Sequence, residues 1–321
     1  ASILQIGIQT FGLSRLPFRY TPYINLQDRQ MKVIGVLIVP VLISTGISDI
    51  SKIVDQALGS TLDGGGLSAL AFGGKINGLV VGICIVSLVT VIFPIISKSA
   101  ASGDIVKLKD ELRQVINTVL MITLPATVIV LTLSDNIVSV LFERGQFGTD
   151  ATKITSEVLF FYSLGLAFAG LRLVLIKVFY SLQDTITVVK CAIVASITNI
   201  ILNFVLIGPL AHKGLALATS LSSVVLVILL SIALKRRVGG GFYQGQPGFF
   251  IKMGVASLLM WFCLHFTESL FVDDDFLMND ISVLTILGVL GMVIYLVSLR
   301  VMRVEEVNCC LLYTSPSPRD S

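Results

Sequence analysis

The sequence predicts an all-α polytopic membrane protein with about eight transmembrane helices and the end of one more. Of its 321 residues, 55% are hydrophobic and only 13% are charged, whereas a soluble domain carries about 25% charged residues. Runs of about 20 apolar residues, long enough to cross a bilayer as helices, recur along the chain. The net charge of +3 is too small to indicate nucleic-acid binding.

The expected spanning helices lie at 33–58, 67–96, 114–133, 154–182, 188–207, 214–234, 250–270 and 281–302. Residues 1–12 are expected to end an earlier helix. Because the chain begins in mid-pattern without Met, we expect it to be a fragment of a longer protein. The amphipathic segment 104–114 is expected to lie along the membrane surface. The Pro-rich tail 310–321 resembles a translated sequencing adapter and is excluded from the fold prediction.

Loop charges predict the orientation, because loops rich in Lys and Arg stay in the cytoplasm. Basic loops alternate with neutral or acidic ones. Cytoplasmic segments are therefore expected at 13–32, 97–113, 183–187 and 235–249, and at the C-terminal end. The loop at 268–280, which carries Glu268 and four aspartates, is expected outside.

Helix 33–58 carries a polar stripe within an apolar span. Ser48, Lys52 and Asp55 follow one another at spacings of four and three, which places them on one helix face, and Asp49 lies at the edge of that face. The stripe is compatible with one wall of a hydrated cavity. It is also compatible with an internal ion pair, in which Lys52 neutralises Asp49 or Asp55. The two interpretations can both hold.

Lys75 is the most informative residue, because a Lys near the middle of a bilayer helix costs about 2.5–3.5 kcal/mol on insertion scales. Its helix, 67–96, offers no acidic partner. Lys75 therefore either pairs with Asp49 or Asp55 on the preceding helix or faces an anionic ligand, with Asn77 beside it. A compact ammonium suits phosphate as a point charge. Glycines spaced by four on the same helix favour close helix packing.

Two further cations, Arg172 and Lys177, lie in 154–182. Lys177 is near enough to the expected cytoplasmic end for its ammonium to reach the interface, whereas Arg172 is deeper and is a second candidate for binding an anion. Asn199 and Asn203 share a face of 188–207 and are expected to hydrogen-bond across helices. The lone His265 is expected to be structural.

Motifs of soluble enzymes and of ATP-driven pumps do not occur in the sequence. The five cysteines have no metal-ligand or disulfide spacing. We therefore expect no enzymatic activity, no cofactor and no metal site. An ion gradient or the membrane potential is the expected energy source, with the coupling ion left open.

Several stretches resemble the MurJ/MviN family of lipid II flippases, within the multidrug/oligosaccharidyl-lipid/polysaccharide (MOP) exporter superfamily. The resemblance runs along about residues 4–237 and includes INLQDRQMKVIG (24–35), ISDISKIVDQALGS (47–60), LSALAFGGKINGLVVG (67–82), IFPIISKSAASGD (92–104), LFERGQFGTDAT (141–152), FYSLQDTIT (179–187) and LNFVLIGPLAHKGLALATSL (202–221). Members of this family have fourteen helices, in two lobes of six and a final pair that forms a lipid-facing groove.

The resemblance implies the C-terminal lobe of such a flippase in the bacterial cytoplasmic membrane. Its parts would be the end of a preceding helix and a cytoplasmic loop (1–32), a six-helix lobe (33–237), a Gly-rich cytoplasmic linker (238–249) and the two-helix groove hairpin (250–309). The implied partners are lipid II, membrane lipids and an N-terminal lobe of the same protein.

The resemblance also implies roles for individual residues. Lys75 occupies the position of a basic residue that is taken to meet the pyrophosphate of lipid II, although Gly74 replaces the acidic or amide residue that usually precedes it. Arg172 falls where relatives often carry a cation. Directly after the FYSLQDTIT motif (179–187), Val188 stands where relatives usually have Pro. The turn at this motif is therefore not expected to be as tight as in those relatives.

Four functions compete at this point. A flippase for lipid II, or for another polyprenyl-linked oligosaccharide, fits the intramembrane cations. A drug/cation antiporter of the same superfamily would favour acidic residues, of which Asp49 and Asp55 are examples. A membrane-embedded polyprenyl-phosphate transferase would need a catalytic cluster of acidic or His residues at a loop face, and we identify no such catalytic cluster in the sequence. A non-transporting scaffold for cell-wall assembly predicts that all intramembrane charges are internally paired.

Overall fold

The computed structural model describes residues 7, 10, 29–62, 64–240, 247–272 and 280–304. Most of the expected helix end at 1–12, most of the loop at 13–32, the centre of the 238–249 linker and the 310–321 tail lie outside the described residues. The chain divides into two units, Ala1–Val39 and Pro40–Ser321. In its described part the first unit is helical from Arg29, and every contact discussed below lies within the second.

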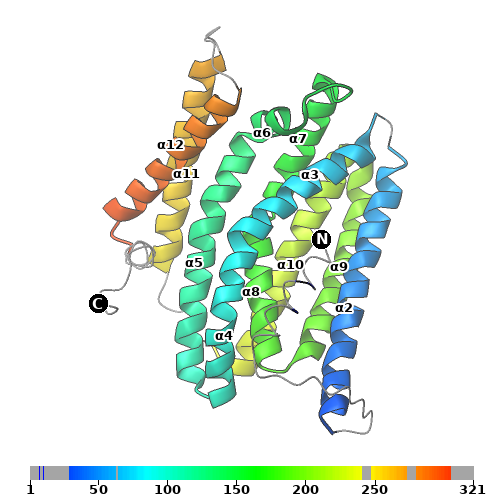
Figure 1. Ribbon diagram of the computed structural model, residues 1–321, viewed down its shortest axis with the longest axis vertical. Helices are drawn as coiled ribbons and strands as arrows, with labels where there is room; N and C mark the ends of the chain where they lie inside the picture. The colour runs from blue at the N-terminus through cyan, green and yellow to red at the C-terminus, as the bar shows by residue number, and fades with distance from the viewer. Residues whose placement is uncertain are drawn as a thin grey trace. The chain divides into compact units, whose positions relative to one another are not determined.

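All eight expected spans are helical (Figure 1). In chain order the described elements are α2 (Arg29–Gly59), α3 (Gly66–Val81), a π-helical turn η1 (Gly82–Val86), α4 (Ser87–Ser102), α5 (Ile105–Thr132), α6 (Ser134–Phe142), α7 (Thr149–Ser163), α8 (Leu166–Ser181), α9 (Thr185–Leu210), α10 (His212–Val238), α11 (Pro247–Val272) and α12 (Asp280–Val301).

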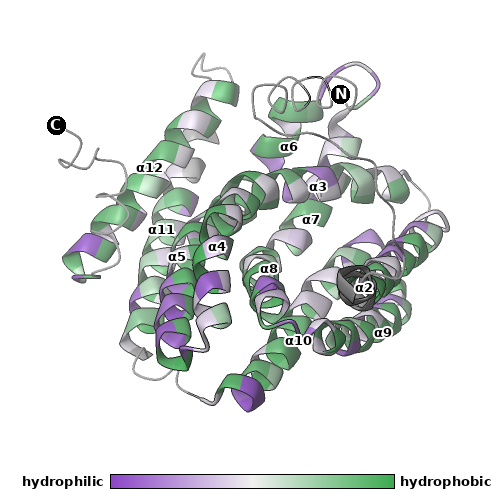
Figure 2. Ribbon diagram, turned by 60° about the horizontal axis from the view of Figure 1, so that its bottom comes forward, coloured by the Kyte–Doolittle hydropathy of each residue, from purple (hydrophilic) through white to green (hydrophobic). Residues whose placement is uncertain are grey.

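Within the described ranges, six helical segments are long and apolar enough to cross a membrane. They are Gly66–Ser102, Ile105–Thr132, Thr185–Leu210, His212–Val238, Gly248–Thr267 and Ile281–Val301, and α7 with α8 adds a seventh if the pair is one bent span. The remaining expected span corresponds to α2, which is helical but is not among these candidates. Hydrophobic residues make up most of the helices (Figure 2). Ile83, Phe204 and Phe262 are each more than 60% exposed, as expected for side chains in lipid.

The prediction of one continuous helix at 154–182 was wrong. The span breaks between α7 and α8, which meet at an angle of 46°. Gly165 at the break lies so close to α10 that a Cβ atom there would be 2.8 Å from the Ser220 Cα. The Ser220 hydroxyl donates a hydrogen bond of 2.7 Å to the carbonyl of Phe161. This side chain satisfies a carbonyl that lies just before the break, where helical bonding is interrupted.

The expectation that 104–114 lies along the membrane surface was also wrong. The segment is the first part of α5, and Asp104 caps it by accepting a 3.0 Å hydrogen bond from the amide of Lys107. Leu108 and Leu112 are each only 1% exposed and belong to the main core cluster, with residues of α4, α8, α10, α11 and α12. The apolar face therefore packs inside the bundle and is not available to a bilayer.

Two long-range contacts identify the two ends of the second unit. At one end, the Lys109 ammonium donates a 3.0 Å hydrogen bond to the Gly240 carbonyl. At the other end, Glu157 of α7 pairs with Lys213 at the start of α10. Two segments expected in the cytoplasm, 97–113 and 235–249, thus meet at one end, and Lys213, in a loop expected outside, contacts α7 at the other.

Candidate functional site

A polar network joins α2, α9 and α10 between otherwise apolar surfaces. The Asn203 amide donates hydrogen bonds to the Asp55 carboxylate at 2.5 Å and to the Asn199 carbonyl at 3.3 Å. Asn199 in turn donates to the Thr219 hydroxyl at 3.5 Å, and Thr219 also hydrogen-bonds to Asp55. The expectation that Asn199 and Asn203 bond across helices is confirmed. Within the described residues Asp55 makes no ion pair, so its carboxylate is held by neutral groups alone.

Two other charged residues of α2, Lys52 and Asp49, form a separate pair. Lys52 donates to Asp49 at 2.9 Å, with side-chain exposures of 70% and 56%. The sequence predicted either Asp49 or Asp55 as the partner of Lys52, and in the structure the partner is Asp49. Ser48, on the same stripe, is exposed. The predicted stripe is thus divided into an outward-facing ion pair and the half-buried Asp55.

Lys75 of α3 is exposed and pairs with neither Asp49 nor Asp55. Its ammonium lies 5.2 Å from the ring centroid of Phe72, one turn earlier on the same helix. A cation over an aromatic face at this distance is stabilised by about 0.5–1 kcal/mol at an exposed site. The side-chain oxygen of Asn77 is buried and has no hydrogen-bond partner in the described structure.

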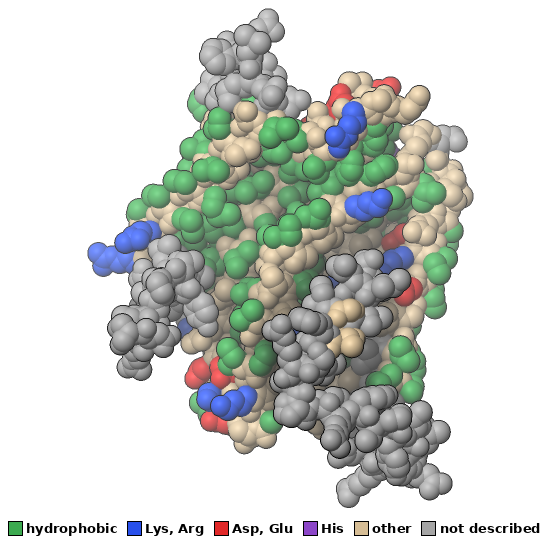
Figure 3. Space-filling model, in the orientation of Figure 1, with side chains coloured by type: hydrophobic (Ala, Val, Ile, Leu, Met, Phe, Trp, Pro, Cys, Tyr) green, Lys and Arg blue, Asp and Glu red, His purple; other side chains and the backbone are tan. Residues whose placement is uncertain are grey.

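The two cations of α8 lie in different surroundings. Arg172 is half-buried and makes no ion pair with any described carboxylate. The Lys177 ammonium lies 5.1 Å from the ring centroid of Phe93 on α4. Across the middle of the face shown in Figure 3, charged side chains are few among hydrophobic ones. An unpaired cation in such surroundings is a candidate for contact with an anion.

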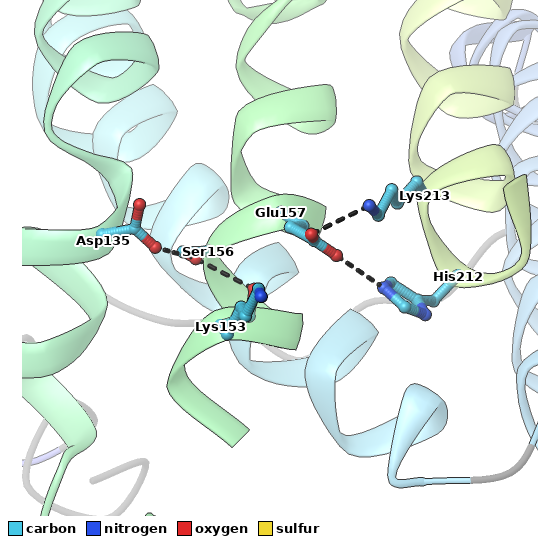
Figure 4. Close-up of polar contacts among 6 residues, drawn as sticks. All are labelled: Asp135, Lys153, Ser156, Glu157, His212 and Lys213. Carbon is cyan, nitrogen blue, oxygen red and sulfur yellow. Dashed lines mark hydrogen bonds and ion pairs between the residues drawn. The ribbon is translucent and has the colours of Figure 1, made fainter. Parts of the chain in front are cut away.

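The sequence analysis missed an ionic cluster at the end of the lobe that is expected to face outside, which is called the outer end below (Figure 4). Glu157 of α7 pairs with the Lys213 ammonium at 2.8 Å and lies 3.3 Å from the His212 ring nitrogen. Beside it, the Ser156 hydroxyl donates to Asp135 of α6. The cluster ties α6 and α10 to α7. The sequence carries no signal for it, because its members are up to 78 positions apart and follow no motif.

A pocket of about 350 Å³ lies near this end and was also missed. Its walls are the turn that precedes α3, the first two turns of α3, the loop before α7, and the first turns of α7. Phe72 and Phe147 line it, with ring centroids 5.4 Å apart and nearly perpendicular planes. These rings come from segments 75 positions apart, so only the folded chain brings them together.

Comparison with known proteins gives consistent results. A family model described as "Lipid II flippase MurJ" matches residues 1–298. The chain is 31% identical over 239 residues to the "Probable lipid II flippase MurJ" of Rhizobium tropici, covering 74% of this chain and 43% of the relative. It is 27% identical over 265 residues to the protein of the same name from Thermotoga maritima, covering 82% and 51%. The chain thus spans about half the length, or less, of these curated relatives.

Solved structures are similar as well. "Lipid II flippase MurJ, inward closed conformation" matches with a TM-score of 0.68 and 26% identity, over 91% of this chain and 58% of that one. A MATE transporter in the straight conformation matches with a TM-score of 0.53 and 19% identity, over 90% and 69%. The second likeness, below 25% identity, shows a similar fold and no more.

Proposed function

The chain belongs to the MurJ lipid II flippase family, and we propose that it is part of a transporter that moves lipid II from the cytoplasmic to the outer leaflet. It is a multi-pass protein of the bacterial cytoplasmic membrane, as its apolar helices and relatives indicate. In this proposal its partner is an N-terminal lobe of the same protein, and the two lobes rock around a central site. The process is transport without a chemical step.

One observation carries the proposal: Lys75 is an intramembrane cation that forms no ion pair within the described residues. A pyrophosphate leaving water loses its hydration, and a cation inside the cavity offsets part of that cost. Arg172, equally without a described carboxylate partner, would supply a second positive charge deeper in the lobe. Lys52 is a weaker candidate, because Asp49 already neutralises it.

The Asp55 network supports an ion-coupled energy source. Carboxylates inside membrane bundles mark ion or proton paths, and the neutral amide and hydroxyl groups around Asp55 leave its charge for a proton or monovalent cation. Each charge that crosses 100 mV provides about 2.3 kcal/mol. Lipid II translocation that continues unchanged after the ion gradients and the potential are collapsed would contradict this part of the proposal.

Asp55 is also the observation that favours a second candidate, a drug/cation antiporter on the same fold. Such a protein would bind its cationic substrate at the carboxylate and would leave Lys75 without a role. The two candidates therefore differ in which charge the transported molecule requires.

The deciding experiment neutralises Lys75 in the chain joined to an N-terminal lobe. Lipid II translocation would be measured at matched expression in cells depleted of their own flippase. Lys75→Gln should reduce translocation at least about tenfold, because a contact to a charged group is lost. Lys75→Arg should retain it. Lys98→Gln, which removes an exposed Lys at the end of α4, is the matched control. Normal translocation by Lys75→Gln would refute the proposed role.

A further inference from the structure

The pocket at the outer end of the lobe has the character of a site for a neutral polar ligand. None of the described residues that line it is charged, so among them an ionic ligand would find no counter-charge. Its volume of about 350 Å³ lies at the lower end of the range for small-molecule sites, about 300–1,000 Å³. The expected occupant is therefore a small, uncharged group rather than an extended chain.

The lining combines aromatic rings with hydrogen-bonding groups. Phe72 and Phe147 form an apolar wall, while Gln146, Ser68 and Thr155 supply an amide and two hydroxyl groups. Gly65 is the N-cap of α3 and provides no side-chain cap, so backbone amides of the first turn are further donors beside the pocket. A sugar ring presents an apolar C–H face and a rim of hydroxyl groups, and it can use both parts of this lining. A polyprenyl tail would leave the polar groups unused.

The pocket adjoins the cation of the proposed transport site. Ser68, Phe72 and Lys75 are spaced by four and three residues and share one face of α3. The Phe72 side chain lines the pocket, and the Lys75 ammonium lies over the same ring, 5.2 Å from its centroid. The cation and the pocket are thus separated by a single aromatic ring.

This arrangement matches the covalent order of a polyprenyl-pyrophosphate-linked oligosaccharide, in which the first sugar is bonded directly to the pyrophosphate. We propose that the pocket formed by α3, α7 and the loop between α6 and α7 binds a sugar of the substrate while its pyrophosphate contacts Lys75. The inference rests on the proposed flippase function and adds a saccharide subsite to it. The pocket lies at the end of the lobe that is expected to face outside, so it would hold the sugar on the exit side.

The test measures binding of two soluble probes to the chain in lipid nanodiscs. Saturation-transfer NMR would be recorded with an uncharged disaccharide of N-acetylated hexosamines and, separately, with inorganic pyrophosphate. Gln146→Ala removes an exposed pocket amide with little risk to folding, and Phe147→Leu removes one ring. Each should weaken disaccharide binding about five- to tenfold. The matched controls Gln56→Ala and Phe160→Leu, whose side chains do not line the pocket, should not.

The Lys75→Gln variant separates this inference from the proposed function. It should weaken pyrophosphate binding and leave disaccharide binding unchanged, because the sugar contacts lie beyond Phe72. No disaccharide binding, or equal binding by the pocket variants and their controls, would overturn the saccharide subsite. If Lys75→Gln still abolished lipid II translocation, the flippase role would stand without the subsite.

Discussion

Replacing Gly165 by Ala tests the packing at the break between α7 and α8. The added Cβ would lie 2.8 Å from the Cα and Oγ atoms of Ser220, where ordinary contacts begin at 3.4 Å. Because one of these atoms is backbone, α10 has to move by about 0.6 Å or the break has to change its angle. Overpacking of this kind costs about 1–3 kcal/mol. Displacing the Ser220 hydroxyl would also remove the hydrogen bond to the Phe161 carbonyl, which adds about 1 kcal/mol.

We therefore expect Gly165→Ala to lower the free energy of unfolding by about 2–4 kcal/mol. The assay is unfolding of the detergent-solubilised chain followed by circular dichroism. Gly254→Ala in α11 is the matched control, because no atom lies within 4 Å of its Cβ position. That change should be neutral or stabilise by up to about 1 kcal/mol, since Ala is the better helix former. Equal stability of the two variants would refute the account of the break given above.

Two further predictions concern topology and the α2 ion pair. Single cysteines would be introduced into a background without the native cysteines. Those at Ser102 or Gly240 should react with membrane-impermeant thiol reagents only from the cytoplasmic side, and those at Gly65 or Asp274 only from outside. The reverse pattern would overturn the predicted orientation. Lys52→Ala should lower stability by less than about 1 kcal/mol, because both members of its pair with Asp49 are exposed. Adding Asp49→Asn should restore that loss in a double-mutant cycle, and a loss of several kcal/mol would show that the pair is buried in the assembled protein.

The helices themselves could be predicted because each span is a local property of about 20 consecutive residues. The break at Gly165 could not, since its cause is Ser220 on another helix, 55 positions away. The segment 104–114 was predicted incorrectly because an amphipathic pattern shows that one face is buried but not what buries it. In this lobe neighbouring helices cover Leu108 and Leu112.

The candidate residues of the site were identifiable because charges in apolar runs are conspicuous, but their partners were not. The Asp55–Asn203 contact joins residues 148 positions apart, so it depends on how α2 packs against α9. The Phe72 ring beside Lys75 is three positions away and was within reach of the helical spacing rule. An aromatic ring stabilises an ammonium as an acidic group does, although more weakly.

The separation of positive and negative charge within the lobe bears on the competing functions. A scaffold would be expected to pair its intramembrane charges internally, because an unpaired charge in a bilayer is costly. In the described part of the chain only the exposed Lys52 and Asp49 are neutralised in this way on α2 and α3, whereas Asp55 is held by amide and hydroxyl groups and Lys75 by an aromatic ring. A direct bridge between Lys75 and Asp55 would have satisfied both charges and left neither for a ligand. Their separation leaves both charges without an ionic partner in the described residues, which is the arrangement that the proposed ion-coupled flippase would use.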